Sequence, residues 1–110
     1  MNLDEETSKL LIDVAVLDPD LSVRYAATRR LRKIVNDNDA AWQTARSFLR
    51  DQSQPEDIRH LALEAVLASN RPEALDAVRE YLRQEQRPEH LGFIKKYYPD
   101  RARQLSANPP

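Results

Sequence analysis

The chain has 110 residues, the length of one compact domain, with 41% hydrophobic and 32% charged residues and a formal net charge of −1. This composition is typical of a globular protein, and the balanced charge excludes attraction of a polyanion by net charge alone. The absence of cysteine excludes disulfides, thiolate metal sites and a cysteine nucleophile. Residues 1–6 are acidic, unlike a signal peptide, and the apolar run 10–17 is too short to cross a bilayer. We therefore expect a soluble, cytoplasmic protein with no membrane partner.

The first half of the chain predicts three helices, because apolar residues recur at spacings of three and four. The first covers about residues 4–17 and places Leu10, Leu11, Val14 and Leu17 on one face. The sequence Asp-Pro-Asp at 18–20 breaks it, and the second helix follows over about 21–35, with Asp20 or Ser22 as N-cap. A polar turn at 36–39 precedes the third helix, over about 40–50.

Prolines mark the helices of the second half. Pro55, Pro72 and Pro88 predict the starts of helices that run to about residues 68, 83 and 97. Pro99 stops the last of these, and a short seventh helix is possible over about 101–105. We place one domain over residues 1–106 and a disordered tail over 107–110. No segment alternates with a period of two, so the expected class is all-α, with short loops between antiparallel neighbours.

The chain resembles itself at intervals of 33 and 35 residues. At 33 residues, Phe48-Leu49 aligns with Tyr81-Leu82, Pro55-Glu56 with Pro88-Glu89 and Trp42 with Leu75. At 35 residues, Val23-Arg24 aligns with Ile58-Arg59, Ala27 with Ala62 and Leu31 with Val66. These matches divide the domain into units of about 4–36, 38–69 and 72–98.

The pattern Asp-Pro-Asp-Leu-Ser-Val-Arg-Tyr-Ala-Ala over 18–27, followed by Leu31, resembles a HEAT repeat. Ile58-Arg59, Ala62, Ala65 and Val66 repeat it with Asp51 or Asp57 as the acid. The third unit departs from the pattern, with Gly92 and Lys95 in place of the arginine and the alanine, as a capping unit would. The resemblance implies a right-handed α-solenoid of about three antiparallel helix pairs. A tetratricopeptide array has a similar period, but its Trp/Leu-Gly-Tyr pattern is missing.

Arg24 and Arg59 are expected to hold neighbouring helices together. Each follows a loop by a few residues, where its guanidinium can pair with a loop aspartate and bind carbonyls at a helix end. The alternative is direct contact with a ligand. The small residues Ala27 and Ala62 are expected to let helix axes approach closely, and Trp42 is expected in the core.

No catalytic, cofactor or metal constellation is visible in the sequence, so we expect no enzyme activity. His60 and His90 lie on different predicted helices without the spacing of a metal pair. Asp18 and Asp20 do not begin a calcium loop, because its glycine and final acid are missing.

A binding surface is predicted on the second helix of each unit, which lines the concave side of such a solenoid. Taking Val23, Ala27 and Ile34 as the buried stripe, with Arg30 near it, the opposite face carries two rows across the units. The candidate partner-binding residues are Tyr25, Arg29, Arg32, His60, Glu64, Leu67, Phe93 and Tyr97. Aromatics with arginine are typical of protein interfaces, although Phe93 and Tyr97 could instead close the end of the stack.

These features favour a non-enzymatic protein–protein interaction module, an adaptor, assembly factor or regulatory subunit that binds another protein. Nucleic acid could instead bind Arg29, Arg32 and Lys33. Resemblance alone suggests an accessory role in bilin or phycobiliprotein handling, because short bacterial HEAT-like proteins include phycobilin lyases. Self-association through the ends of so short a stack is a third alternative, so we expect a monomer or weak homo-oligomer.

Overall fold

The computed structural model describes residues 4–107. The tail was predicted over 107–110, but Ala107 is the last residue of a helix, and 108–110 lie outside the described residues. Within the described residues the protein is all-helical, with no strand, and it has seven α-helices rather than the predicted six with an optional seventh. The helices are α1 (Glu5–Leu17), α2 (Leu21–Arg30), α3 (Asp39–Arg50), α4 (Glu56–Ala68), α5 (Ala74–Gln84), α6 (Pro88–Tyr97) and α7 (Pro99–Ala107).

Side-chain caps explain where the first three helices begin. Asp4 accepts a hydrogen bond from the backbone N–H of Thr7 at 2.7 Å, and Asn38 accepts one from that of Ala41 at 2.9 Å. Before α2 the cap is Asp20, whose carboxylate accepts from the backbone N–H of Ser22 at 2.9 Å. Each cap satisfies an N–H group that has no partner inside its helix.

Two helix ends differ from the prediction. The second helix was expected to continue to about Val35, but α2 ends at Arg30 and a single 3₁₀ turn, η1 (Leu31–Lys33), follows it. Leu31, Ile34 and Val35 are all buried, so the tighter turn still delivers three apolar side chains to the core. At the other end of the chain, Pro99 begins a helix instead of only stopping one, because proline is well suited to the first helical turn.

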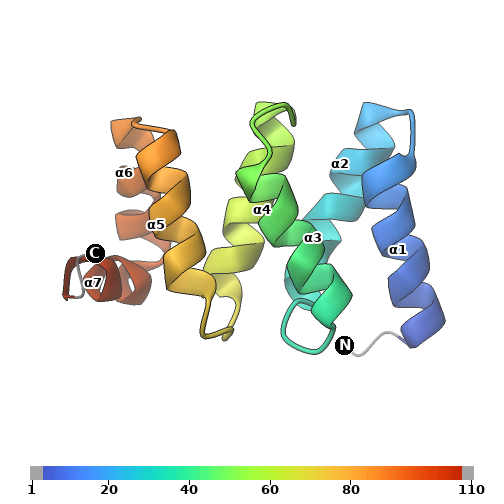
Figure 1. The fold of residues 1–110 in the computed structure, drawn as a ribbon, viewed down its shortest axis with the longest axis horizontal. Coiled ribbons are helices and arrows are strands. Elements are labelled where there is room, and N and C mark those ends of the chain that lie inside the picture. Colours follow the sequence, from blue (N-terminus) through green and yellow to red (C-terminus); the bar gives the residue numbers. More distant parts are fainter. Residues whose placement is uncertain (1–3, 108–110) are drawn as a thin grey trace.

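The odd-numbered helices contact one another in succession along the long axis of the molecule, α1 with α3, α3 with α5, and α5 with α7. α2 contacts α4 behind this row, and α1 packs against α2 as α3 packs against α4 (Figure 1). The molecule measures 39 × 27 × 21 Å. α1 lies at one end of the long axis, and α6 and α7 lie at the other.

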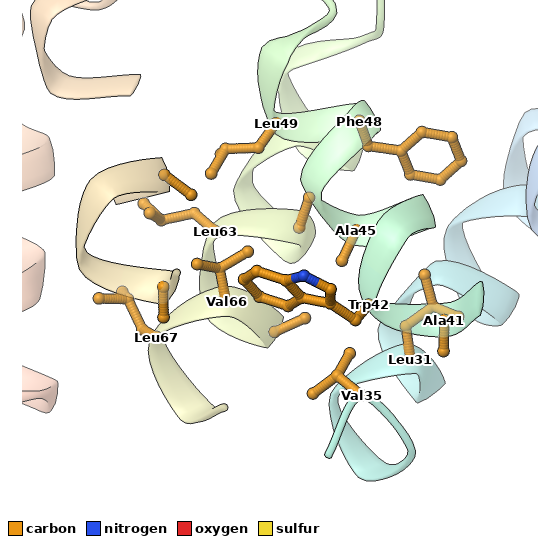
Figure 2. Packing of buried hydrophobic residues seen from close by; sticks show 14 of the residues in the cluster. Leu31, Val35, Ala41, Trp42, Ala45, Phe48, Leu49, Leu63, Val66 and Leu67 are labelled. Carbon is orange, nitrogen blue, oxygen red and sulfur yellow. The ribbon is translucent and has the colours of Figure 1, made fainter. Parts of the chain in front are cut away.

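One apolar core runs between these helices, with Trp42 at its centre. The indole is 2% exposed and lies among Leu31, Val35, Leu63 and Val66, as Figure 2 shows. The predicted core position of Trp42 is therefore confirmed. Ala27 and Ala62 are also buried, in agreement with their expected role where helices approach closely.

The ends of the molecule expose apolar residues that the sequence placed in the core. Leu10 and Leu17 of α1 are 65% and 74% exposed, and Val23 of α2 is 40% exposed. Leu91 of α6, which lies one repeat interval of 33 residues after the fully buried Ile58, is 39% exposed at the other end. Periodicity predicts the apolar stripe of a helix, but only a neighbouring helix buries it. No neighbour covers these stripes among the described residues.

Candidate functional site

Arg24, in the first turn of α2, reaches back to the end of α1. Its Nε donates to the carbonyl oxygen of Ala15 at 3.0 Å, and its Nη2 donates to Gln54 Oε1 at 2.6 Å. Ala15 lies in the last turn of α1, where carbonyls lack an intrahelical partner. Gln54 belongs to the loop before α4. Arg24 therefore joins the first helix pair to the second.

Arg59 makes the same kind of connection one unit later. Its Nη2 donates to the carbonyl oxygen of Leu49, in the last turn of α3, at 2.7 Å, and its Nη1 forms an ion pair with Glu85 beyond α5. The Arg59 side chain is only 7% exposed, and its guanidinium carbon lies 5.0 Å from the centre of the Tyr81 ring. The hydrogen bond from Arg59 lowers the pKa of Glu85 below its ordinary value.

The expected structural role of Arg24 and Arg59 is thus confirmed, although their side-chain partners are not the predicted loop aspartates. Those aspartates bind within their own loops. Asp18 accepts from the backbone N–H of Asp20, and Asp51 accepts from both the backbone and the hydroxyl of Ser53. The bonds to Ser53 lower the pKa of Asp51, and the charge of Arg59 adds to this as its weakest cause.

Two further arginines, which the sequence analysis missed, bind helix ends on the opposite edge. Arg71 Nε donates to the carbonyl oxygen of Val35 at 2.9 Å, and its Nη1 pairs with Asp39 at 2.5 Å. Arg101 donates to the carbonyl oxygens of Leu67, at 3.2 Å, and Ser69. Arg71 directly precedes Pro72, before α5, and Arg101 follows Pro99 by two residues, inside α7. A proline near the start of each helix was the available signal.

The site predicted on α2, α4 and α6 forms most completely between α4 and α6. The rings of His60 and Phe93 meet edge to face at 4.7 Å, and the rings of Phe93 and Tyr97 lie 5.0 Å apart. Tyr98, at the end of α6, places its ring 6.0 Å from Phe93. We call His60, Phe93, Tyr97 and Tyr98 the aromatic cluster. Its outermost member, Tyr97, is 58% exposed, so the cluster is open to solvent.

Charged groups surround the aromatic cluster. Glu64 Oε2 lies 3.9 Å from His60 Nε2, one helical turn away on α4. Lys96 Nζ lies 5.2 Å from the centre of the Tyr97 ring. Burial raises the pKa of Tyr98, and the charge of Glu64 raises it further while that of Arg32 lowers it. Arg32, in η1, therefore lies within electrostatic reach of Tyr98.

A hollow of about 670 Å³ adjoins the aromatic cluster, between the end of α4 and the junction of α6 with α7. Its lining is mixed, with Leu67, Tyr97 and Tyr98 beside polar residues such as Asp100 and Arg101. Such a hollow beside half-exposed rings can receive an apolar side chain.

The predicted site residues fall into three groups. The structure brings His60, Glu64, Phe93 and Tyr97 together. Tyr25, Arg29 and Arg32 are exposed on α2 and η1, but Tyr25 makes no ring contact with His60 among the described residues. Leu67 is 3% exposed and belongs to the core instead of the exposed face on which it was expected, and it reaches the surface only as part of the lining of the hollow. Tyr98 was missed because it follows the last residue of α6, where the helical period no longer predicts the direction of a side chain.

Four basic residues of α2 and η1 are exposed. Arg29, Arg32 and Lys33 are exposed as predicted. Arg30 is exposed too, although it lies beside the predicted stripe, because it lines a groove with Val23 and Ala27.

His90 occupies a buried polar position beside the Arg59 connection. Its Nε2 lies 3.3 Å from the hydroxyl oxygen of Tyr81, and the two rings meet edge to face at 5.0 Å. Burial lowers the pKa of His90, and the charge of Arg87 lowers it further. Burial likewise raises the pKa of Tyr81. This pair packs α6 against α5.

Over residues 4–107, no group of three or more His, Cys, Asp or Glu side chains is placed to hold a metal ion. None of the helices found in that range combines the length and apolar character needed to cross a membrane. Comparison with known proteins yields no matching family model, no matching curated protein and no matching solved structure.

Proposed function

We propose that this chain is a non-enzymatic protein-binding module that captures an acidic segment of another protein on the aromatic cluster. The contact of His60 with Phe93 carries the proposal, because it joins α4 and α6 into one half-exposed surface. Exposed aromatic side chains beside arginine are the typical anchors of protein interfaces.

In this proposal the helix pairs form a HEAT-like, right-handed α-solenoid. The successive contacts of α1, α3 and α5, with α2 against α4 behind them, support it. So do Arg24 and Arg59, which make equivalent bonds 35 residues apart. A rigid surface of this kind loses little conformational entropy when it binds.

The charge around the aromatic cluster favours an acidic partner. Arg32 is exposed, with its charge within reach of Tyr98, and Lys96 lies against Tyr97. The opposing charges are Glu64, which is partly buried beside His60, and Asp100 at the hollow, which pairs with Arg103. A partner segment with acidic residues and one apolar side chain would satisfy both the cationic rim and the hollow.

The test is a selection from a random peptide library with the full chain as bait. We expect the enriched peptides to be acidic and to contain an aromatic or large aliphatic residue. Tyr97→Ala and Arg32→Glu should each weaken their binding by about tenfold or more. Both side chains are exposed, so neither substitution should disturb the fold.

Arg83→Glu is the matched control for the charge reversal, because Arg83 is exposed on α5 and makes no contact with the aromatic cluster. Equal weakening by Arg83→Glu and Arg32→Glu would contradict the proposal. A single-stranded or duplex oligonucleotide that bound the wild type in a salt-dependent manner, while no peptide was enriched, would favour the nucleic-acid alternative.

A further inference from the structure

The outer surface of the first helix pair is the most apolar exposed region among the described residues. Leu10, Val14 and Leu17 recur at spacings of four and three along α1, so they form one stripe. Leu10 and Leu17 are two of the most exposed large apolar side chains, and Val14 is partly buried. Exposed stripes of this kind mark interaction surfaces.

A groove of about 300 Å³ runs beside this stripe, between α1 and α2. Apart from Thr7 at one end and Arg30 on α2, every residue that lines it is apolar: Leu10, Leu11, Val14, Val23, Ala26 and Ala27. We call the stripe and this groove the α1–α2 face. The face lies at the end of the molecule that has no further helix beyond α1 (Figure 1).

The two ends of the stack are closed differently. At the far end α7 packs against α5 and α6, and Ala102 and Leu105 of α7 lie against the core. No helix of the described residues covers the outer side of α1 and α2 as α7 covers α5 and α6. A second helix pair laid on the α1–α2 face would extend the packing that α3 and α4 provide on its inner side.

The charges at the rim fit a second copy of the same chain. Glu6 lies one turn before Leu10 on α1, and Arg30 lies at the end of α2. Because α1 and α2 run in opposite directions, both charges lie at the same end of the face, where Thr7 and Arg30 line the groove together. Neither forms an ion pair within residues 4–107.

We propose that two copies of the chain associate through the α1–α2 face about a two-fold axis parallel to these helices. The axis places α1 of each copy over α2 of the other, in a four-helix arrangement. Glu6 of each copy then lies near Arg30 of its partner, and both pairs form at once, as a two-fold interface requires. This inference is independent of the proposed function, because the aromatic cluster lies on α4 and α6.

The test is sedimentation velocity of the full chain at protein concentrations from about 1 to 300 µM, a range over which a weak dimer forms from its monomers. We expect a shift toward twice the 12.7 kDa chain mass as concentration rises. Leu10→Gln and Leu17→Gln should each raise the dimer dissociation constant about tenfold. Val16→Gln is the matched control, because Val16 is exposed on the other side of α1, and it should leave the constant unchanged.

Charge reversal tests the geometry. Glu6→Arg and Arg30→Glu should each weaken association, and the double variant should restore most of it, because it rebuilds both pairs with the charges exchanged. Circular dichroism checks that each variant keeps its helix content. A monomer at every concentration would overturn the proposal, as would a double variant no better than either single one. Binding of wild-type monomer to zwitterionic vesicles, lost in Leu10→Gln, would overturn it in favour of a lipid surface.

Discussion

Arg24 and Arg59 occupy equivalent positions in successive units and make equivalent backbone bonds, yet their surroundings differ. Arg24 is partly buried near the open end of the molecule and binds the neutral amide of Gln54. Arg59 is buried in the middle, binds the carboxylate of Glu85 and lies over the Tyr81 ring. The comparison shows that one sequence pattern places its arginine in different surroundings. We expect the two connections to differ in strength, because burial and the charge of the partner set the strength of a hydrogen bond.

The largest expected effect in this comparison is that of Arg59→Met. The substitution keeps the apolar stem but leaves the carbonyl of Leu49 and the carboxylate of Glu85 without their donor. We expect the free energy of unfolding to fall by about 3 kcal/mol, as measured by urea denaturation. Arg83→Met, at an exposed arginine on α5, should change it by less than about 0.5 kcal/mol.

Arg24→Met should lower the free energy of unfolding by less, about 1 kcal/mol in the same denaturation measurement, since solvent can replace the bonds that a partly exposed guanidinium makes with a neutral amide. If Arg24→Met lowered the free energy of unfolding as much as Arg59→Met, the different burial of the two arginines would not affect how strongly they stabilise the protein.

The third unit has no arginine at the position equivalent to Arg24 and Arg59. Gly92 of α6 occupies that position. An added Cβ would meet no atom within 4 Å there. Gly92→Ala should therefore stabilise the protein by about 0.5–1 kcal/mol, because alanine favours the helix interior. Thermal unfolding followed by circular dichroism measures the change, and a lower midpoint would mean that α6 needs the glycine for another reason.

The smallest expected effect concerns pH, at the His90–Tyr81 pair beside Arg59. Burial keeps the pKa of His90 in the folded protein below its ordinary value of 6.5. The unfolded chain therefore binds more protons at this residue, and its contribution to stability falls as pH decreases through 6.5 toward the lower folded pKa. His90→Gln should flatten the pH dependence of unfolding in that window.

His60→Gln provides the control for this titration, because the His60 ring is partly exposed in the aromatic cluster. A pH dependence that persisted unchanged in His90→Gln, or that disappeared in His60→Gln instead, would assign the titration to another group.

Much of the secondary structure was predictable because its signals are local. Prolines at 55 and 88 and the caps Asp4 and Asn38 lie within one turn of the helix starts. The errors arose where the chain folds back on itself. η1 brings Val35 to Arg71, 36 residues later, and no periodicity within residues 21–35 could indicate that contact.

The candidate site was predictable in part. Helical spacing correctly placed His60 and Phe93 on facing positions of α4 and α6, because both lie inside regular helices. Tyr98 escaped because it follows the last regular turn of α6. Leu67 is more buried than predicted because its side chain belongs to the core, a contact that the period of α4 alone does not reveal.

The sequence by itself determined the all-helical class, most helix boundaries and the two arginines that bind helix ends, because each depends on neighbouring residues or on a repeat. The partners of those arginines, Gln54 and Glu85, were decided only by the tertiary structure, because they lie 30 and 26 residues away. So was the exposure of Leu10, Leu17 and Val23. An apolar stripe is a property of one helix, whereas its burial depends on whether another helix lies against it.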